Sequence, residues 1–383
     1  MIGFDLTQEQ MALQEKARKF AREEILPVAA KLDREGTFPL EIMKKAHGEG
    51  FLTLLVPKEY GGGGFGILDT CLVSEELAAG DMGIFVSIFV NTLALYPIIR
   101  FGTAEQKDRF LTPFGAQFAL ASYCLSEYHV GSDPASMETT AAIDGQAYIL
   151  NGTKMWITNG GYADLYLVFA TTDRQKRHKG VISLIVPAAL PGIRRGEEIE
   201  KMGQRASNTT AVTFKNVRVP KENLLAGEGE GFKKAMTALD ITRPMIASGA
   251  VGLARTAMEL AVQYAKRRVA FGVPIAQHQA IQFLLADMAI GIDAARLLVW
   301  RAAALADRGV RNSKEAAISK AWAADMAMRV TTDAVQIYGG MGYTKWHPVE
   351  KLMRDAKVIQ IYEGSAQVMR MIIARSLLGE IGV

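Results

Sequence analysis

The spacing of apolar residues changes twice along this 383-residue chain, and these two changes limit the fold more than any other feature. Up to about residue 118, apolar residues recur at intervals typical of helices. Between about residues 119 and 227 they gather in short β-rich runs bounded by turn residues, and from Gly231 onward the helical spacing returns. We therefore predict a mainly α fold with a central β domain: a helical domain at 1–119, a β domain at 120–228 and a helical domain at 229–383.

Local signals predict individual elements within these three parts. Thr7 and Gln10 resemble a capping box, and the apolar stretch 84–95 predicts a buried core helix. Asp144-Gly145 and Asn151-Gly152 each predict a hairpin turn. Long helices are expected at 236–268, 280–306 and 314–337, and strands at 148–150, 165–170, 181–186 and 211–214.

Three glycines, Gly61, Gly63 and Gly66, match the G-x-G-x-x-G signature of a dinucleotide-binding turn. Such a turn belongs to a fold in which strands alternate with helices. Here the glycines follow a helical-to-loop stretch, and no βαβ unit surrounds them. We interpret the run as a flexible connector between helices, which argues against a nicotinamide-binding domain.

The composition is that of an ordinary globular protein, with 49% hydrophobic and 22% charged residues. The balance of 44 Lys and Arg against 40 Asp and Glu is too small to predict a nucleic-acid partner. Cys71 and Cys124 form no C-x-x-C pair, and the N-terminus resembles neither a signal peptide nor a transit segment, so we expect a cytoplasmic protein. No run reaches the roughly 18 uninterrupted apolar residues of a membrane helix. A membrane is therefore not expected as a partner. The five histidines lack metal-ligand spacing, so a metal is not expected either.

Six separated motifs resemble those of the acyl-CoA dehydrogenase family, in the family's order and spacing and over essentially the whole chain. The chain is most similar to short- and medium-chain members. The motifs are YCLSEYHVGSD at 123–133, KMWITNG at 154–160, MGQRASNTT at 202–210, RRVAFG at 267–272, QIYGGMGY at 336–343 and MRDAKVIQIYEGSAQ at 353–367.

This resemblance implies an N-terminal helical domain, a small β-barrel domain and a C-terminal four-helix bundle. It also implies FAD as the cofactor, an acyl-CoA thioester as the substrate and electron-transfer flavoprotein as the electron acceptor. The family assembles as a homotetramer in which FAD contacts two subunits, and the same is expected here. The expected reaction is α,β-dehydrogenation of an acyl-CoA to the trans-2-enoyl-CoA.

Oxidation of an unactivated Cα–Cβ bond requires a base for the α-proton and an acceptor for the β-hydride, which protein side chains cannot provide. Glu363 matches the family's base in the YEG motif, although taken alone it would be an ordinary solvated glutamate. Some family members carry the base at the position of Thr242, where a threonine cannot serve. Gly364 would let the thioester approach the backbone, and the Glu363 N–H would polarise the thioester carbonyl.

The flavin contacts implied by the resemblance come from segments far apart in sequence. Trp156, Ile157 and Thr158 match the segment along the flavin, with the threonine hydroxyl near N5, although core packing alone would account for a tryptophan on a strand. Arg268, with Gly339 and Gly340, matches positions that bind the pyrophosphate and adenosine across the subunit interface. The other implied contacts are Tyr123, Leu125, Ser126, Ser132, Phe271, His278, Gln279, Gln336, Ile337, Ser365 and Gln367.

The substrate contacts implied by the resemblance surround the expected base. Ser132 is expected at the CoA moiety as well as near the flavin. Asp240 and Arg243 stand three residues apart on an expected helix, a spacing that is also common in simple surface pairs. The full set is Ser132, Phe89, Asp240, Arg243, Tyr362 and Gly364.

Two positions depart from the family pattern. Ser365 stands where threonine is commoner, and it keeps the hydroxyl. Tyr128-His129-Val130 follows Glu127, where the family usually has proline and a small residue. The added bulk is either a neutral loop variant or a device for substrate selection or flavin shielding, and the sequence favours neither.

The segment 85–95 matches the helix that lines the family's acyl cavity. Phe89 stands where a medium-chain relative would carry glutamate, and Val90, Ala94 and Tyr96 replace smaller or more flexible groups. These residues predict a compact cavity for a short, branched or cyclic acyl group. Open alternatives are a flavin-dependent 1,4-dehydrogenation, an enoyl-CoA reduction on the same fold, and a non-catalytic flavoprotein component.

Overall fold

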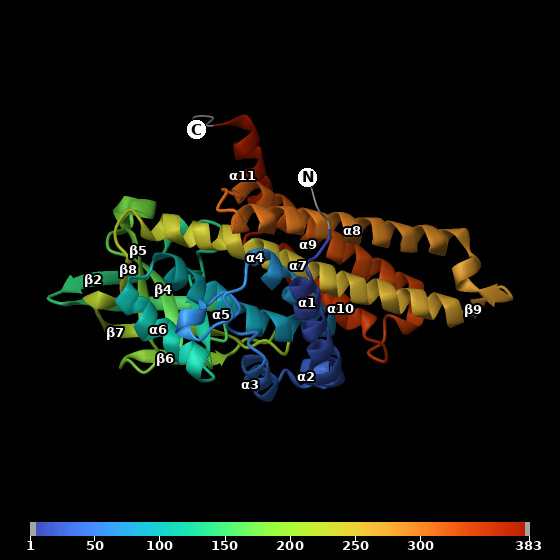
Figure 1. The fold of residues 1–383 in the computed structure, drawn as a ribbon, viewed down its shortest axis with the longest axis horizontal. Helices are drawn as coiled ribbons and strands as arrows, with labels where there is room; N and C mark the ends of the chain where they lie inside the picture. The colour runs from blue at the N-terminus through green and yellow to red at the C-terminus, as the bar shows by residue number, and fades with distance from the viewer. Residues whose placement is uncertain (1–4, 380–383) are drawn as a thin grey trace.

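The computed structural model describes residues 5–379 (Figure 1). Helices form the first third of the chain, strands the middle, and long helices the last part, which confirms the mainly α fold with a central β domain. A π-helical turn, Ala21–Ile25, joins the first two helices. The helices are α1 (Gln8–Phe20), α2 (Leu26–Glu35), α3 (Leu40–Gly48), α4 (Ile67–Gly80), α5 (Met82–Phe101), α6 (Ala104–Ala116), α7 (Gly231–Arg267), α8 (Gln279–Asp307), α9 (Ser313–Tyr338), α10 (Val349–Lys357) and α11 (Ala366–Leu378).

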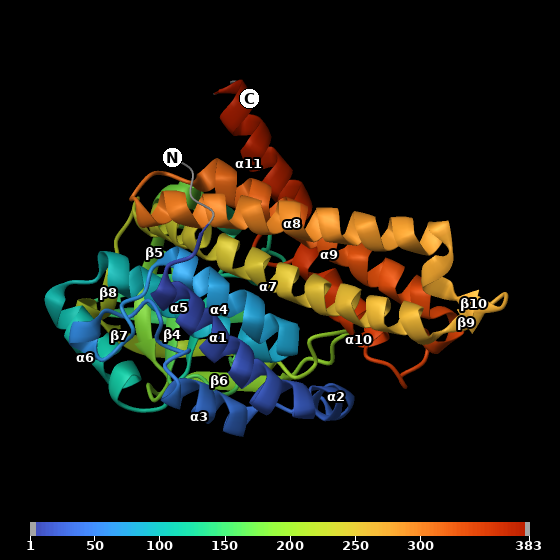
Figure 2. The same ribbon diagram turned by 45° about the vertical axis from the view of Figure 1, so that its right-hand side comes forward.

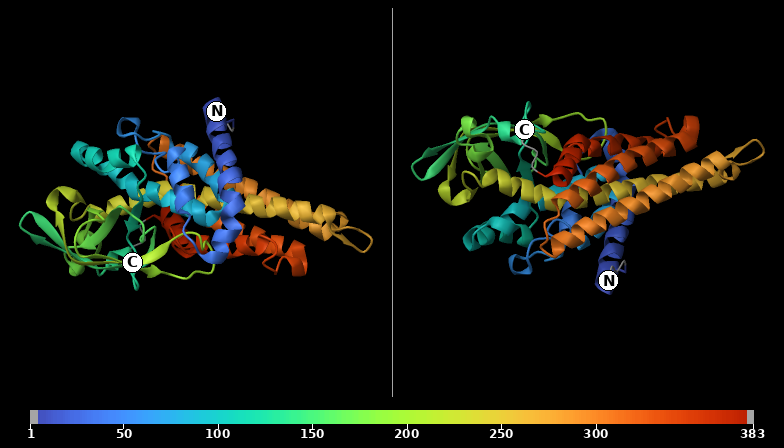
Figure 3. Two further views of the ribbon diagram at one scale, coloured as in Figure 1. Left: turned by 90° about the horizontal axis from the view of Figure 1, so that it is seen from below. Right: turned by 90° about the horizontal axis from the view of Figure 1, so that it is seen from above.

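The strands of the middle part form one mixed sheet. Their order is β6-β7-β3-β2-β4-β5-β8, and β1 pairs with β4 in parallel. Figure 3 shows this β domain at one end of the molecule, below the long C-terminal helices in the left-hand view. The strands are β1 (Ala121–Cys124), β2 (Thr140–Asp144), β3 (Ala147–Thr158), β4 (Leu165–Thr171), β5 (Val181–Pro187), β6 (Ile193–Glu198), β7 (Thr209–Pro220) and β8 (Leu224–Ala226).

One of the two predicted hairpin turns is confirmed and the other is wrong. Asp144 pairs with Ala147 where β2 turns into β3, so the Asp144-Gly145 turn is present. Asn151-Gly152 lies inside β3, where the register with β7 shifts and forms a bulge. A β-carbon at Gly152 would come within 2.5 Å of the Thr139 hydroxyl, and its φ is 145°. Glycine is therefore needed here for close packing within a strand and not for a turn.

The long helices α7, α8 and α9 run side by side and form the core of the C-terminal part (Figure 2). The helix α10 packs against α9, and α11 also contacts α9 before it stands out from the bundle. A short hairpin of β9 (Val269–Ala270) and β10 (Val273–Pro274) projects from the far end of the bundle, away from the β domain (Figure 1).

The remaining local predictions fall where the sequence placed them. The Thr7 hydroxyl accepts from the Gln10 backbone N–H at 3.2 Å, and the Gln10 side chain accepts from the Thr7 N–H at 3.0 Å, so the capping box is present. The glycine run after residue 60 connects a short 3-10 turn to α4. A β-carbon at Gly62 would lie 2.1 Å from the Val56 carbonyl oxygen, so this connector packs closely against the preceding loop.

Among residues 5–379, two helices, α5 and α7, are long and apolar enough to cross a membrane by length and composition alone. Within their most apolar windows, 89% of the α5 residues and 67% of the α7 residues are buried inside the protein. Their apolar character is therefore explained by their place in the core, as predicted for the stretch 84–95.

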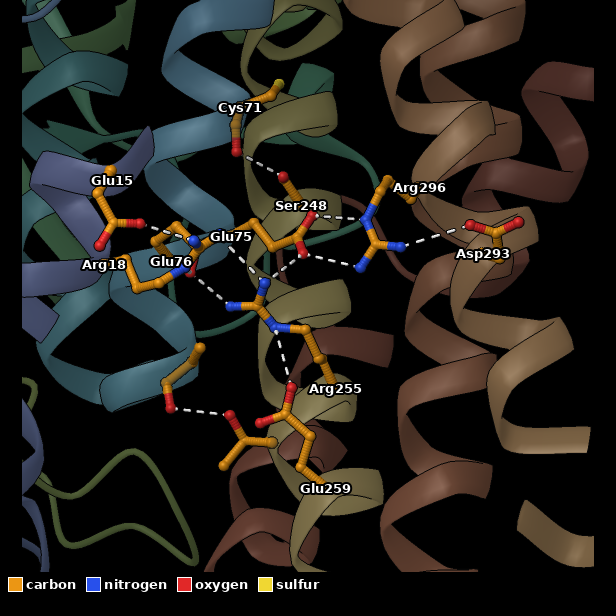
Figure 4. Close-up of polar contacts among 12 residues, drawn as sticks. Glu15, Arg18, Cys71, Glu75, Glu76, Ser248, Arg255, Glu259, Asp293 and Arg296 are labelled. Atoms are coloured by element: carbon orange, nitrogen blue, oxygen red, sulfur yellow. Dashed lines mark hydrogen bonds and ion pairs between the residues drawn. The ribbon is translucent and has the colours of Figure 1, made fainter. Parts of the chain in front are cut away.

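A buried network of ion pairs joins the N-terminal helices to the bundle (Figure 4). The Glu76 carboxylate on α4 forms ion pairs with the guanidinium groups of Arg255 on α7, at 2.6 Å, and of Arg18 on α1, at 2.9 Å. The neighbouring Glu75 receives Arg296 of α8 at 2.9 Å. Burial would raise the pKa of Glu76, but the hydrogen bonds from Arg255 and Arg18 outweigh it and hold the pKa below 4.5. Four helices are thus tied together through two adjacent glutamates.

Replacement of Glu76 by alanine should lower the free energy of unfolding by about 3 kcal/mol, because Arg255 and Arg18 both lose their buried partner and Arg255 keeps only Glu75 as a buried partner, at 3.1 Å. The folded-state pKa of Glu76 lies below 4.5. Its stabilisation is therefore present above that pH and is lost as the pH falls through the lowered value. Urea unfolding of the wild type and of Glu76→Ala at pH 7 and at acidic pH measures both effects.

The matched control is Glu49→Ala, which removes the partner of Lys16 from an exposed pair at 3.1 Å. An exposed pair contributes less than about 1 kcal/mol. Equal losses in the two variants would show that the buried network does not hold the helices together.

Candidate active site

Glu363 lies between a 3-10 turn (Val358–Gln360) and α11, and its carboxylate is the centre of the candidate site. Its oxygen Oε2 is buried and has no hydrogen-bond partner among residues 5–379. Burial raises the pKa of Glu363 from 4.5 to about 7, although the charges of Arg243 and Lys320 act in the opposite direction. A carboxylate with these properties can accept a proton near neutral pH.

The backbone at Glu363 is left-handed, with φ of 56° at Glu363 and 94° at Gly364. This conformation is uncommon for glutamate and persists only where the surroundings hold it. Two cations contact the segment: Arg243 Nε donates to the Glu363 carbonyl oxygen at 3.2 Å, and Lys320 Nζ donates to the Gly364 carbonyl oxygen at 2.5 Å. The direction of the glutamate side chain is therefore fixed from α7 and from α9.

Asp240 and Arg243, which the resemblance places beside the substrate, are paired on α7. Arg243 Nη1 lies 2.7 Å from Asp240 Oδ1, and the arginine side chain is only 4% exposed. The Ser313 hydroxyl donates to the other oxygen of Asp240 at 2.5 Å. Since Arg243 also contacts Glu363, the pair belongs to the site and is not a solvent-exposed surface pair.

Lys320 on α9 belongs to the same site, although no motif pointed to it. The residue is fully buried, and burial lowers its pKa from 10.5 to about 7 while the charge of Glu363 raises it. A signal was present in the sequence: Ala316, Ala324 and Ala327 share the helix face of Lys320 and are all buried. A lysine in a row of small apolar residues at helical spacing is expected to face the interior.

Two tyrosines border the glutamate. The Tyr362 hydroxyl accepts from the Gln204 side-chain amide at 3.2 Å. Tyr123 on β1 is buried, and its hydroxyl donates to the Ala235 carbonyl oxygen at 3.3 Å. Burial, and then the charge of Glu363, raise the pKa of Tyr123 well above its usual value. The structure thus brings Tyr123 and Tyr362, predicted for flavin and substrate, into one place with Glu363.

Ser365 and Gln367, predicted as flavin contacts, lie at the start of α11. The Ser365 hydroxyl accepts from the Val368 backbone N–H at 3.2 Å and caps this helix. Its own proton is free to be donated elsewhere. Gln367 is the second residue of the helix and is exposed.

The predicted flavin segment occupies the end of β3. Trp156 has a φ of 63° and is 53% exposed, which is unusual for a large apolar side chain on a strand. Ile157 is buried, and the Thr158 carbonyl oxygen accepts from the Ser122 hydroxyl at 2.7 Å. Core packing therefore does not account for Trp156, whose ring is presented at the surface.

The loop after β1 is anchored to this strand by a buried ion pair. Lys154 Nζ lies 2.8 Å from Glu127 and also donates to the Leu125 carbonyl oxygen at 3.0 Å. The Met155 N–H donates to the Ser126 carbonyl oxygen at 3.0 Å. Leu125 and Ser126, two predicted flavin contacts, therefore lie beside the Trp156 segment, whereas Ser132 is exposed further along the loop.

Tyr128 and His129, which depart from the family pattern, form the tip of a tight turn. Glu127 and Val130 exchange backbone hydrogen bonds at 2.9 and 3.1 Å, so the two aromatic residues project from the turn. The Tyr128 side chain is 70% exposed, and its ring lies edge-on to that of His129. Below the turn, the buried Glu127 accepts from the backbone N–H groups of Glu138 and Thr139.

A second group of predicted flavin contacts lies at the far end of the bundle, at the β9–β10 hairpin and the end of α9 (Figure 1). There a cavity of about 410 Å³ is lined by Arg268, Ile337, Gly339 and Gly340, together with Tyr264 and Tyr338. No atom lies within 4 Å of a β-carbon built at Gly339 or Gly340, so their backbone is open to a ligand. A guanidinium beside open glycine backbone suits a phosphate-bearing group such as FAD.

The other members of this second group surround the cavity. The exposed fraction of Phe271 is 96%, and its ring lies edge-on to His278. Gln279 begins α8, and Gln336 lies in the last turn of α9; both are exposed. The predicted flavin contacts therefore form two separate groups in one chain, one near Glu363 and one at this hairpin.

The predicted acyl-cavity residues lie on α5 in the core. Phe89 and Val90 are each 5% exposed, and the Phe89 ring lies 5.8 Å from that of Phe85. A β-carbon at Gly249 of α7 would come within 2.5 Å of the Phe85 ring. The helix of Phe89 is thus packed directly on α7, the helix that carries Arg243.

Among residues 5–379, no cluster of three or more His, Cys, Asp or Glu side chains is arranged to hold a metal ion.

Comparisons with known proteins give consistent matches along the whole chain. The models for the N-terminal, middle and C-terminal domains of acyl-CoA dehydrogenase match residues 7–117, 122–217 and 229–378. The human mitochondrial short-chain specific acyl-CoA dehydrogenase is 43% identical over 376 residues, which is 98% of this chain and 91% of that protein.

Two solved structures are similar over nearly their full length. Butyryl-CoA dehydrogenase from Megasphaera elsdenii superposes with a TM-score of 0.96 and 40% identity, over 98% of this chain and all of that one. A chain solved in work on the electron transferring flavoprotein of Acidaminococcus fermentans gives a TM-score of 0.97 and 43% identity, over 99% and 100% of the two chains.

The cavity at Gly340 leads to a prediction about cofactor retention. Gly340→Leu should weaken FAD binding, because the new side chain would enter the cavity without clashing with the protein. Ligand at 100 times its dissociation constant stabilises the native state by about 2.7 kcal/mol. Added FAD should therefore raise the melting temperature of the flavin-stripped wild type but much less that of the variant.

The control is Gly48→Leu, since Gly48 ends α3 on the surface with open space around it. This variant should keep the flavin content and the FAD-dependent melting shift of the wild type. If Gly340→Leu also kept both, the cavity would not be part of the flavin site.

Proposed function

The chain belongs to the acyl-CoA dehydrogenase family, and we propose that its substrate is the CoA thioester of a short, branched or cyclic acid, with Glu363 as the base. The protein is an FAD-dependent oxidoreductase that dehydrogenates acyl-CoA. The observation that carries the assignment of the base is the Glu363 oxygen Oε2, which is buried and lacks a hydrogen-bond partner in the described chain, together with a pKa raised to about 7.

In the proposed reaction the Cα–H proton passes to Glu363 and the Cβ–H hydride leaves, so that a trans double bond forms between the two carbons. When bound, FAD supplies the hydride acceptor. The carboxylate must be ionised and shielded from water to remove a proton from so weak an acid. The burial of Oε2 favours the second condition, and the charges of Arg243 and Lys320 favour the first. A β-carbon at Gly364 would clash with the Met369 side chain, so only glycine fits at this position. The thioester would approach the backbone here, and the Glu363 N–H would polarise its carbonyl.

We place the flavin ring beside Trp156, Ile157 and Thr158, next to Glu363, and its adenosine end at Arg268, Gly339 and Gly340 of a second copy of the chain. Support comes from the separation of these two groups within one chain, since each group supplies only half of the expected contacts. A homotetramer would complete each site. The proposed domains, 1–119, 120–228 and 229–383, then meet around the cofactor.

Electron-transfer flavoprotein is the proposed electron acceptor. The similar chain solved in work on the Acidaminococcus fermentans electron transferring flavoprotein supports this partner. A cytoplasmic location is proposed from the sequence, and the two cysteines, Cys71 and Cys124, are buried and unlinked as a reducing setting would leave them.

The first test concerns the base. Glu363→Gln should retain FAD and bind thioester, but the rate of flavin reduction should fall by at least about two orders of magnitude, the usual contribution of a general base. Stopped-flow absorbance under anaerobic conditions, with butyryl-CoA as the reductant, measures this rate. Glu41→Gln, on the exposed face of α3, is the control and should reduce at the wild-type rate. Near-normal reduction by Glu363→Gln would refute the assignment.

The second test concerns the acyl group. Activity should peak at short or cyclic thioesters and fall for chains of around eight carbons, because overpacking a closed cavity costs roughly 1–3 kcal/mol. Phe89→Ala should move the optimum toward longer chains, since each buried methylene contributes about 0.8 kcal/mol where there is room. A panel of thioesters of increasing length measures both profiles.

The control for this panel is Phe110→Ala. Phe110 is similarly buried, but it lies on α6 and not on the helix of the expected cavity. That variant should lose stability without changing the order of preferred substrates. A wild-type optimum at long chains, or an unchanged Phe89→Ala profile, would show that Phe89 does not limit the cavity.

A further inference from the structure

Lys320 is a buried amine without an ion-pair partner in the described part of the chain, and because burial lowers its pKa to about 7 it is partly charged at neutral pH. Its side chain is fully enclosed between α9 and the segment that carries Glu363, and its Nζ donates to the Gly364 carbonyl oxygen at 2.5 Å. Apart from Glu363, the acidic groups nearby are otherwise engaged: Asp240 pairs with Arg243, and Asp325 pairs with Arg370. Burying an ammonium group is strongly unfavourable, so a compensating contact is required.

The compensation comes from the site itself. The Gly364 carbonyl oxygen is held by Lys320 and the Glu363 carbonyl oxygen by Arg243, so two consecutive left-handed residues are each fixed by a cation. The conformation at Glu363 would otherwise relax toward a commoner backbone region. Relaxation would turn the carboxylate away from its present position.

We propose that Lys320 is a positioning residue for the base: its hydrogen bond to Gly364 fixes the direction of the Glu363 side chain, and its positive charge stabilises the ionised carboxylate. This inference rests on the proposed role of Glu363. Arg243 already has Asp240 as a counter-charge, whereas Lys320 has no such partner, so its charge is the less compensated of the two.

The sign of the effect follows from the groups around the carboxylate. Burial raises the pKa of Glu363, and Arg243 and then Lys320 lower it. Loss of the Lys320 charge should therefore raise the pKa of Glu363 further and leave a larger fraction of the base protonated at neutral pH. The charged and titratable groups that face the pair are Asp240 and Arg243 from α7, Asp325 from α9, Arg370 from α11, Tyr123 from β1, and Tyr362.

The test uses the FAD-loaded enzyme and 3,3-dimethylbutanoyl-CoA, whose β-carbon carries no hydrogen and which therefore cannot be dehydrogenated. In D₂O, Glu363 would remove the α-proton and return a deuteron, so that a C–H bond becomes a C–D bond without hydride transfer. Proton NMR follows the loss of the α-proton signal from pH 5 to pH 9, a range of about two units on each side of the raised pKa.

Because Lys320 itself loses its proton near pH 7, Lys320→Met should move the midpoint of this pH profile upward by up to about one unit and slow exchange at pH 7 by about two- to fivefold. Lys320→Gln, which keeps a hydrogen-bond donor but no charge, should show the same upward shift. Lys320→Arg keeps the charge, so its midpoint should stay near that of the wild type. Lys314→Met removes a lysine from the start of the same helix and should leave the profile unchanged.

A purely structural lysine would give a different result: Lys320→Met would melt at a lower temperature, but its midpoint would match the wild type. That outcome, or a Lys320→Arg midpoint shifted as far as that of Lys320→Met, would overturn the proposal. If Lys320→Met does not fold, Lys320→Gln decides on the same criterion. Wild-type exchange by Glu363→Gln would instead refute the base itself, so the two failures are distinguishable.

Discussion

A base for a weakly acidic C–H bond must be kept from water and from strong hydrogen-bond donors, yet it must still be able to ionise. Glu363 meets these requirements because its carboxylate is left free while its backbone is held. Arg243 and Lys320 contact the carbonyl oxygens of Glu363 and Gly364 and leave Oε2 alone. Hydrogen bonds from the two long helices α7 and α9 thus hold the strained backbone of Glu363 and Gly364 in place.

The N-terminal helices depend on the same bundle. Glu75 and Glu76 of α4 are joined to Arg296 of α8 and Arg255 of α7 by buried ion pairs. The next helix, α5, carries Phe89 and packs on α7 through the close contact of Phe85 with Gly249. Arg243 of α7 contacts the base segment, and Gly249 of α7 contacts the helix expected to line the acyl cavity. The distance between the expected acyl cavity and the base is therefore set by α7, and a shift of α4, which is ion-paired to α7, would be transmitted to both contacts.

The sequence predicted the order of helices and strands because periodicity depends on local burial, and long segments average over single exceptions. It failed where a residue's surroundings are distant in sequence. Asn151-Gly152 has the composition of a turn, but Gly152 is required by the approach of Thr139, which no local pattern reveals. Lys320 was missed because a lysine on a helix is normally exposed. Glu363 was found only through the family motif, since its burial comes from α7 and α9.

The turn at Tyr128-His129 shows how one part of such a site can vary while its neighbours stay fixed. Glu127 and Lys154 form a buried ion pair beneath the turn. Lys154, which lies two residues before Trp156, also donates a hydrogen bond to the Leu125 carbonyl oxygen. The turn is closed by backbone hydrogen bonds between Glu127 and Val130. The side chains of the two tip residues, Tyr128 and His129, are therefore not needed to hold it. Larger side chains can therefore be placed at the tip without moving the strand expected to face the flavin. The substrate preference can thus change at this turn while the expected contacts to the cofactor stay the same.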